Sequence, residues 1–248
     1  EPGQYAVGSI FLSADAKSAA WQVSEIERVA ADEGQAVLGW RDVPHNPAAI
    51  GRVARAELPT IRQVFITAGG VASSDQDAFE RKLYVIRRRV ENAVAANFRG
   101  DDPFYVPSLS SRTIAYVGML IAHQIDDFYP DLTDEAMVSA MAFVHSRYST
   151  NTMPTWALAH PFRYLAHNGE INTLRGNRNA MFARQGTMAS ELFGDDLQKL
   201  YPIMRDGASD SAQCDNVLEF LALTGRELPE AMLMMIPEAW ENRPDMDT

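Results

Sequence analysis

Cysteine is nearly absent from this 248-residue chain, where Cys214 is the only one. A single thiol cannot form an internal disulfide, so a disulfide framework is excluded. Long apolar runs are also missing, because no window approaches the roughly 18 residues of a membrane-spanning helix. The first residues lack the ordered basic and apolar regions of a signal peptide. We therefore expect a cytoplasmic protein with no membrane partner.

Basic residues are too few to balance the acidic ones, and the net charge is −11 at pH 7. An acidic chain is repelled by phosphate backbones, so nucleic acid is not expected as a partner. Apolar residues make up 46% of the chain, which is enough for a substantial core. We expect residues 1–248 to form a single domain.

The first third alternates between patterns typical of strands and of helices. Strands are predicted over residues 5–12, 36–40 and 61–67. A helix is predicted over residues 18–33 with Gly34 just past its end, and a short helix starts at Pro47 and runs to about residue 56. Two successive strand–helix–strand units indicate an α/β arrangement of this region.

A long helix is predicted over residues 76–96, capped by Ser74 or Asp75 after a loop at residues 69–74. Phe79, Leu83, Ile86 and Val90 would form its buried stripe. Three consecutive arginines, residues 87–89, follow near its end. They suggest either an anion site or a solvated face that favours the C-terminal dipole, and we expect the solvated face.

The second half contains more strand patterns and several polar segments. A turn is predicted at residues 100–103, and strands at 105–110 and 112–120 would pair. Further predictions are a helix start at 131–136, a buried strand at 141–150, a strand at 164–167, and a loop leading into a helix over 170–184. The last helices would run from Asp215 or Asn216 to residue 223, closed by Gly225, and from Pro229 to residue 236.

Asn168 and Gly169 follow a strand-like segment and form the strongest turn signal in the chain. The pair also presents a side-chain amide and an unencumbered backbone N–H at one point, and an oxyanion hole needs two such donors. The alternative is an ordinary hairpin turn.

Two charged residues would complement this pair. Arg147 stands where an apolar segment becomes polar, and its guanidinium could clamp a carboxylate or form a structural salt bridge. Asp210 lies between Ser209 and Ser211, where it could accept from a substrate ammonium or serve as a helix cap. Together with Asn168 and Gly169 they would form a pocket for glutamine or a close relative.

Other reactive residue types give little support for a site. His145, His160 and His167 lack the spacing of a zinc helix, so a metal site is not expected. Cys214 heads into a helix with no base beside it, and we interpret it as a packed thiol.

Several motifs together resemble the glutaminase domain of the glutamate synthase large subunit. The main ones cover residues 145–152, 161–163, 166–177 and 209–211, and further matches cover 1–5, 38–44, 79–83, 107–113, 128–132 and 236–240. The resemblance runs nearly from end to end. It implies a class II glutamine amidotransferase with an α+β, N-terminal-nucleophile fold, a four-layer αββα sandwich of stacked antiparallel sheets.

The resemblance also implies a mechanism and partners. An N-terminal Cys attacks the glutamine amide, its own α-amine can act as base, and glutamate and ammonia result. In the full synthase the ammonia reacts with 2-oxoglutarate in domains that hold FMN and an iron–sulfur cluster, and this chain itself would hold no cofactor. Arg147 would bind the carboxylate of L-glutamine, Asp210 its amino group, and Asn168 with Gly169 the oxyanion.

The chain departs from the family pattern at its first residue, which is Glu1 and not Cys. We therefore expect the nucleophile and the first strands to be absent, glutamine turnover by this chain alone to be absent, and self-association through exposed sheet edges. His160 replaces the family's Gln. The alternative function is a non-catalytic remnant that binds a ligand or a partner.

Overall fold

The computed structural model describes residues 4–70, 75–98, 103–150, 152–171, 173–205 and 207–236. Its strands are β1 (Tyr5–Leu12), β2 (Ala36–Asp42), β3 (Thr60–Thr67) and β4 (Tyr105–Ser110). Its α-helices are α1 (Ala16–Asp32), α2 (Arg52–Ala56), α3 (Gln76–Asn97), α4 (Ile125–Phe128), α5 (Leu174–Gln185), α6 (Asp210–Leu223) and α7 (Leu228–Met235). Short 3₁₀ helices are η1 (Pro47–Ala49), η2 (Ala122–Gln124), η3 (Pro130–Thr133), η4 (Trp156–Leu158) and η5 (Gly194–Leu200). Residues 71–74 of the predicted loop and 100–102 of the predicted turn lie outside the described residues.

The described strands form one antiparallel sheet in the order β2-β3-β1-β4. The register of β1 against β3 runs from Tyr5 opposite Thr67 to Leu12 opposite Thr60. The α/β interpretation of the first third is wrong, because β3 inserts between β1 and β2 and pairs antiparallel with both. This is a split β-α-β arrangement, and the architecture is α+β.

Local signals of the first third are confirmed at the helix ends. Gly34 follows α1 with a φ of 75°, a conformation that costs glycine little. The side chain of Asn46 accepts from the backbone N–H of Ala48 and so caps η1, whose first residue is Pro47. The carboxylate of Asp75 accepts from the backbone N–H of Ala78 at 2.8 Å and caps α3.

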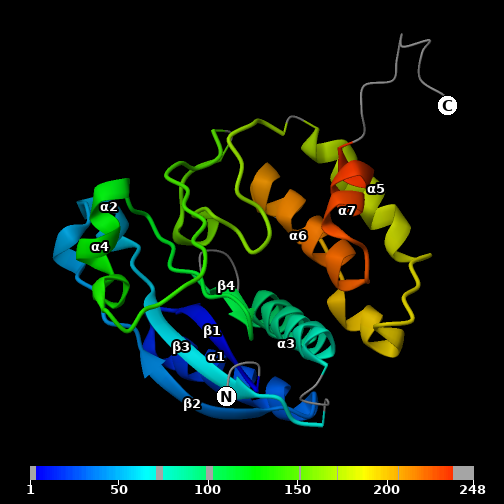
Figure 1. The fold of residues 1–248 in the computed structure, drawn as a ribbon, viewed down its shortest axis with the longest axis horizontal. Helices are drawn as coiled ribbons and strands as arrows, with labels where there is room; N and C mark the ends of the chain where they lie inside the picture. The colour runs from blue at the N-terminus through cyan, green and yellow to red at the C-terminus, as the bar shows by residue number, and fades with distance from the viewer. Residues whose placement is uncertain are drawn as a thin grey trace.

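Alternation along the strands divides the core into two layers, one on each face of the sheet. Ile10, Leu12, Val64 and Ile66 pack against α1 and α3, and these helices supply the members Ile26, Val29, Phe79, Leu83, Ile86 and Val90. Phe11, Ile61 and Tyr105 lie in the layer on the other face. In Figure 1, α5, α6 and α7 gather at one end of the molecule and α2 and α4 at the other.

The second face is covered by irregular chain and short helices, not by strands. The strands predicted over 112–120, 141–150 and 164–167 are wrong, because no described residue there belongs to a sheet. Trp156 fills this layer: its ring nitrogen donates to the Ala54 carbonyl at 3.0 Å, and a Cβ at Gly118 would come within 2.5 Å of its ring. Glycine at position 118 therefore allows the close approach.

Residues 137–144 are apolar but exposed in the described structure. Val138 is 86% exposed, Val144 81% and Phe143 70%. A β-prone sequence forms a strand only beside another strand. The described residues provide no neighbouring strand here, which explains why the prediction of a buried strand failed.

Helix starts in the second half also differ from the prediction. The helix start at 131–136 is only the 3₁₀ turn η3. Helix α6 begins at Asp210, earlier than predicted, because the Ser209 hydroxyl accepts from the backbone N–H of Ala212 at 3.1 Å and caps it. Gly225 follows the helix with a φ of 93°, as predicted. No helix among the described residues is long and apolar enough to cross a membrane.

Helix α3 is buried on two sides, and this overturns the interpretation of its arginines. Tyr84 and Val85 pack against Phe193, Leu197, Leu200, Ile203 and Phe220, on the side away from the sheet. Arg87 and Arg88 lie on this buried part of the helix, and their side chains are only 2% exposed. The prediction of a solvated face is therefore wrong for Arg87 and Arg88.

Candidate active site

The start of α6 supplies the most buried of the predicted site residues. Asp210 is the first residue of the helix and is 5% exposed. Its carboxylate accepts from the Ser149 hydroxyl and from the Ser211 backbone N–H, both at 2.7 Å. The positive end of the helix dipole favours an ionised carboxylate at this position.

Two histidines connect the remaining segments to α6. His167 and Ser211 share a hydrogen bond of 2.7 Å between the ring Nε2 and the hydroxyl. His145 Nδ1 accepts from the backbone N–H of Arg147 at 3.2 Å, so its Nε2–H donates to the carbonyl of His167 at 2.6 Å. These two bonds assign the neutral Nε2–H tautomer to His145. The segments that carry Arg147, Asn168 and Asp210 are thus joined to one another.

The other predicted site residues lie at the surface of this junction. Arg147 is exposed, and its side chain forms no ion pair with any described residue. Asn168 and Gly169 are also exposed and form a bend. Because none of the described residues beside them belongs to a strand, the hairpin alternative is wrong. The arrangement leaves the Arg147 side chain and the Asn168 amide available to a ligand.

His160 packs between the other two histidines. Its ring lies 4.5 Å from that of His145 and 5.9 Å from that of His167, measured between centroids. Burial, reinforced by His145 and His167, lowers the pKa of His160 to about 4, against the opposing charge of Asp210. His160 is therefore neutral at pH 7. No group of His, Cys, Asp and Glu among the described residues has the arrangement of a metal site.

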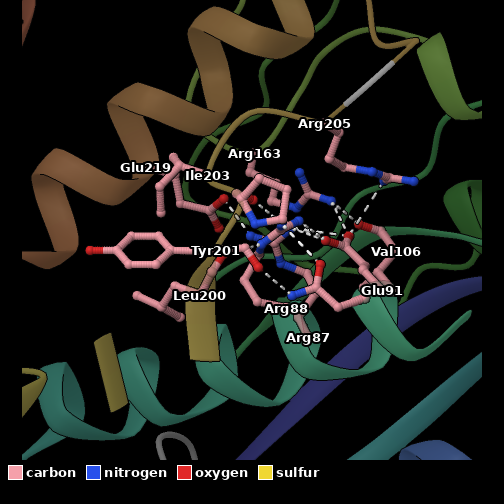
Figure 2. A network of polar contacts seen from close by, with 12 residues as sticks. Arg87, Arg88, Glu91, Val106, Arg163, Leu200, Tyr201, Ile203, Arg205 and Glu219 are labelled. Carbon is pink, nitrogen blue, oxygen red and sulfur yellow. Dashed lines mark hydrogen bonds and ion pairs between the residues drawn. The ribbon is translucent and has the colours of Figure 1, made fainter. Parts of the chain in front are cut away.

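Beneath these segments lies a buried ionic network that the sequence did not predict (Figure 2). Four arginines and three carboxylates form it: Arg87, Arg88, Arg163, Arg205, Glu91, Asp215 and Glu219. Its members come from α3, from α6 and from the two segments that precede Asn168 and Asp210. The network thus connects the elements that carry the candidate site.

Glu91 is the centre of the network. Its carboxylate lies 2.5 Å from Arg88, 3.1 Å from Arg87, 3.5 Å from Arg163 and 3.6 Å from Arg205. Burial by itself would raise the pKa of Glu91, but the four guanidinium groups hold it far below its usual range. Glu91 is therefore ionised at pH 7.

Residues 200–203 are attached to α3 by the same network. Arg88 Nε donates to the Leu200 carbonyl at 3.2 Å, and another nitrogen of Arg88 donates to the Pro202 carbonyl. The Asn92 amide donates to the Tyr201 carbonyl at 2.8 Å. These bonds fix the chain that leads to Asp210.

Asp215 connects α6 to the segment before Asn168. One carboxylate oxygen accepts from the backbone N–H of Tyr164 at 2.7 Å and of Leu165 at 3.0 Å. The other oxygen lies 3.7 Å from Arg163. Burial raises the pKa of Asp215 to about 6, against the lowering effect of Arg163. Asp215 was predicted only as a helix cap, and that prediction is wrong.

Cys214 lies beside this network and is half-buried. Burial, reinforced by the charges of Asp215 and Asp210, raises the pKa of its thiol to about 11. A thiol with so high a pKa is almost wholly protonated at pH 7 and is a poor nucleophile. This agrees with its interpretation as a packed thiol.

Comparison with known proteins identifies the class. The family model for class-II glutamine amidotransferases matches residues 1–248. The chain therefore belongs to the class-II glutamine amidotransferase family.

The similar relatives within this class are glutamate synthases. The chain is 50% identical over 246 residues to the glutamate synthase [NADPH] large chain of Bacillus subtilis, covering 99% of this chain and 16% of that protein. It is 43% identical over 255 residues to the glutamate synthase [NADH] of Saccharomyces cerevisiae, covering 100% of this chain and 12% of that protein. It is also 43% identical to the chloroplastic ferredoxin-dependent glutamate synthase of rice, Oryza sativa subsp. japonica, covering 97% of this chain and 15% of that protein. The chain thus spans less than a fifth of the length of these relatives.

Proposed function

We propose that residues 1–248 hold L-glutamine for hydrolysis in the glutaminase domain of a glutamate synthase. Arg147 binds the α-carboxylate through two parallel hydrogen bonds, and Asp210 accepts from the α-ammonium. The glutamine side-chain amide then lies at Asn168 and Gly169. Attack on this amide gives a tetrahedral oxyanion, which the Asn168 amide and the Gly169 N–H stabilise.

The observation that carries this proposal is the junction of three segments. The hydrogen bonds from His145 to the His167 carbonyl, between His167 and Ser211, and from Ser149 to Asp210 join the segments of the proposed carboxylate, oxyanion and ammonium contacts. A ligand held at both a carboxylate and an ammonium is an amino acid. Membership of the class-II glutamine amidotransferase family supports glutamine in particular.

The attacking thiol comes from outside residues 1–248 in this proposal, because the only cysteine of the chain is the half-buried Cys214, whose thiol has a raised pKa. By family resemblance it is an N-terminal Cys whose own α-amine takes the proton. The ammonia passes to synthase domains of the same polypeptide, which hold FMN and an iron–sulfur cluster and use 2-oxoglutarate. One cysteine cannot supply the ligands of such a cluster, so in this proposal the cluster lies outside residues 1–248. A reducing compartment, the cytoplasm, fits a chain with one free thiol.

We also propose that the complete domain is a four-layer αββα sandwich. Support comes from the β-prone segment around Phe143 and Val144, which is exposed and has no strand beside it in the described structure. Strands from the rest of the polypeptide would pair with this segment and form a second sheet. Residues 1–248 alone should therefore self-associate, and a monomer by light scattering at tens of micromolar would contradict this.

Calorimetric titration of residues 1–248 with L-glutamine tests the binding site. We expect binding of L-glutamine but not of D-glutamine, and a loss of about 10- to 100-fold in affinity for Arg147→Ala and for Asp210→Asn, the range for hydrogen bonds to charged groups. Arg226→Ala is the control, since Arg226 is an exposed arginine whose ion-pair partner among the described residues is Glu230 of α7. Equal affinities of Arg147→Ala and the control would refute the assignment.

Ammonia release tests the reaction. We expect none from residues 1–248 alone and glutamine-dependent release from the complete polypeptide. Release by residues 1–248 that Cys214→Ser abolishes would show that the thiol is internal. Glutamine binding with no release from the complete polypeptide would favour a non-catalytic binding module.

A further inference from the structure

Asp215 holds the turn that leads into Asn168 and Gly169. The turn is closed by a backbone hydrogen bond from Phe162 N–H to the Leu165 carbonyl at 3.0 Å. Within the turn, the backbone N–H groups of Tyr164 and Leu165 both donate to a single oxygen of Asp215. Asp215 lies on α6, the helix that begins with Asp210, so one side chain links the two halves of the proposed glutamine site.

Arg163 strengthens this link from the opposite side. It donates to the Val106 carbonyl of β4 at 2.5 Å and reaches Glu91 of α3 at 3.5 Å and Asp215 at 3.7 Å. The turn is thereby attached to the sheet and to two helices. Figure 2 shows Arg163 and Arg205 converging on Glu91 from the segments before Asn168 and Asp210.

We propose that Asp215 is a positioning residue for glutamine hydrolysis, which sets the place of Asn168 and Gly169 relative to Asp210. The inference rests on the proposed function. Oxyanion donors act only when they lie about 2.7–3.1 Å from the developing charge. A displacement of about 1 Å in such a group reduces the rate about 100-fold. Without Asp215, the Tyr164 and Leu165 N–H groups lose their acceptor and the turn loses its attachment to α6.

Two variants separate the positioning role from general stability. Asp215→Ala removes the acceptor, whereas Asp215→Asn keeps an oxygen that can accept from both N–H groups. Glu219→Gln is the matched control, because Glu219 is also buried on α6 and pairs with Arg87 but forms no hydrogen bond or ion pair with the described residues of the turn. Loss of the Glu219 charge should lower the melting temperature and leave the position of the turn unchanged.

The test measures kcat and KM for glutamine hydrolysis in the complete polypeptide that contains residues 1–248. We expect kcat to fall about 10- to 100-fold in Asp215→Ala, within the range of a displaced donor, while KM for glutamine changes less than about threefold. Asp215→Asn should keep kcat within about threefold of the unmodified protein, and Glu219→Gln should keep both constants. An unchanged kcat in Asp215→Ala, or an equal fall in Glu219→Gln, would overturn the positioning role.

Failure of the proposed function is recognised separately, because the unmodified polypeptide would then release no ammonia from glutamine. That result would overturn the role of Asp215 as well. If Asp215→Ala does not fold, Arg163→Lys replaces it, since lysine keeps the charge but cannot bridge Glu91, Asp215 and the Val106 carbonyl together. We expect a fall in kcat of about 10-fold or more with unchanged KM. A kcat equal to that of the unmodified protein in Arg163→Lys would overturn the proposal.

Discussion

Replacement of Glu91 by Gln should destabilise the protein far more than the same replacement at Glu230. Both glutamates lie four residues after the arginine with which they pair: Glu91 follows Arg87 on α3, and Glu230 of α7 follows Arg226, which lies just before that helix. The Arg87–Glu91 pair is 2% exposed on both sides, whereas the Arg226 and Glu230 side chains are 43% and 52% exposed. The two variants therefore compare one chemical change in two environments.

The magnitude follows from the contacts of Glu91. At an effective dielectric constant of about 20, one pair of unit charges 3.1 Å apart gains about 5 kcal/mol before desolvation is subtracted. Gln at position 91 would leave the buried guanidinium groups of Arg87, Arg88 and Arg163, and the partly exposed one of Arg205, facing an uncharged amide. Removing one partner of a buried pair costs about 3–5 kcal/mol. An exposed pair such as Arg226–Glu230 contributes only about 0.2–1 kcal/mol.

Urea unfolding at pH 7, followed by circular dichroism, measures the unfolding free energy of both variants, and heating under the same conditions measures their Tm. We expect Glu91→Gln to lose about 3–5 kcal/mol of unfolding free energy and about 6–20 °C in Tm, and Glu230→Gln to lose less than 1 kcal/mol. A Glu91→Gln variant that is unfolded at 25 °C would agree with this expectation. Losses below 1 kcal/mol in both variants would refute the view that Glu91 holds the network together.

Two further outcomes follow from pKa shifts. Burial raises the pKa of the Cys214 thiol, so little thiolate is present at pH 8. We expect the thiol to react with iodoacetamide about 100-fold more slowly than a free cysteine. Labelling at the rate of a free cysteine would contradict its burial. Burial alone would raise the pKa of Glu33, but hydrogen bonds from Lys199, Lys82 and Arg89 hold it below its usual value of 4.5. The contribution of Glu33 to stability is therefore present above about pH 4.5 and is lost as the pH falls further. Melting temperatures between pH 6 and 3 should fall less steeply in Glu33→Gln, and parallel curves for the two proteins would show that Glu33 contributes nothing.

The sequence predicted the elements whose signals are local. The alternation in residues 5–12 and 61–67 gave the strands, and Gly34, Asp75 and Gly225 marked helix ends correctly. Strand order was not predictable, because nothing in these segments shows that β3 inserts between β1 and β2. The strand predicted over residues 141–150 does not form, for a related reason. Apolar residues indicate a tendency to form a strand, but a strand also needs a neighbouring strand.

The sequence likewise indicated some residues of the candidate site but not the network beneath them. Arg147, Asn168, Gly169 and Asp210 stood out because their residue types occur in recognisable motifs. The buried network beneath them did not, because burial of an arginine depends on segments distant in the sequence. One available signal was overlooked: Tyr84 and Val85 lie off the main apolar stripe of α3 and indicate a second buried side.

Because α3 is buried on two sides, we expect the described residues to unfold as a single cooperative unit. Phe79, Leu83 and Ile86 belong to the core beside the sheet, while Tyr84 and Val85 belong to the core beside α6. Side chains of α3 contribute to both cores. Loss of packing in one core should therefore disturb the packing of the other. Unfolding should therefore be one transition, and a fragment that ends before α5 would expose Tyr84 and Val85 together with the buried charges of Arg87 and Glu91.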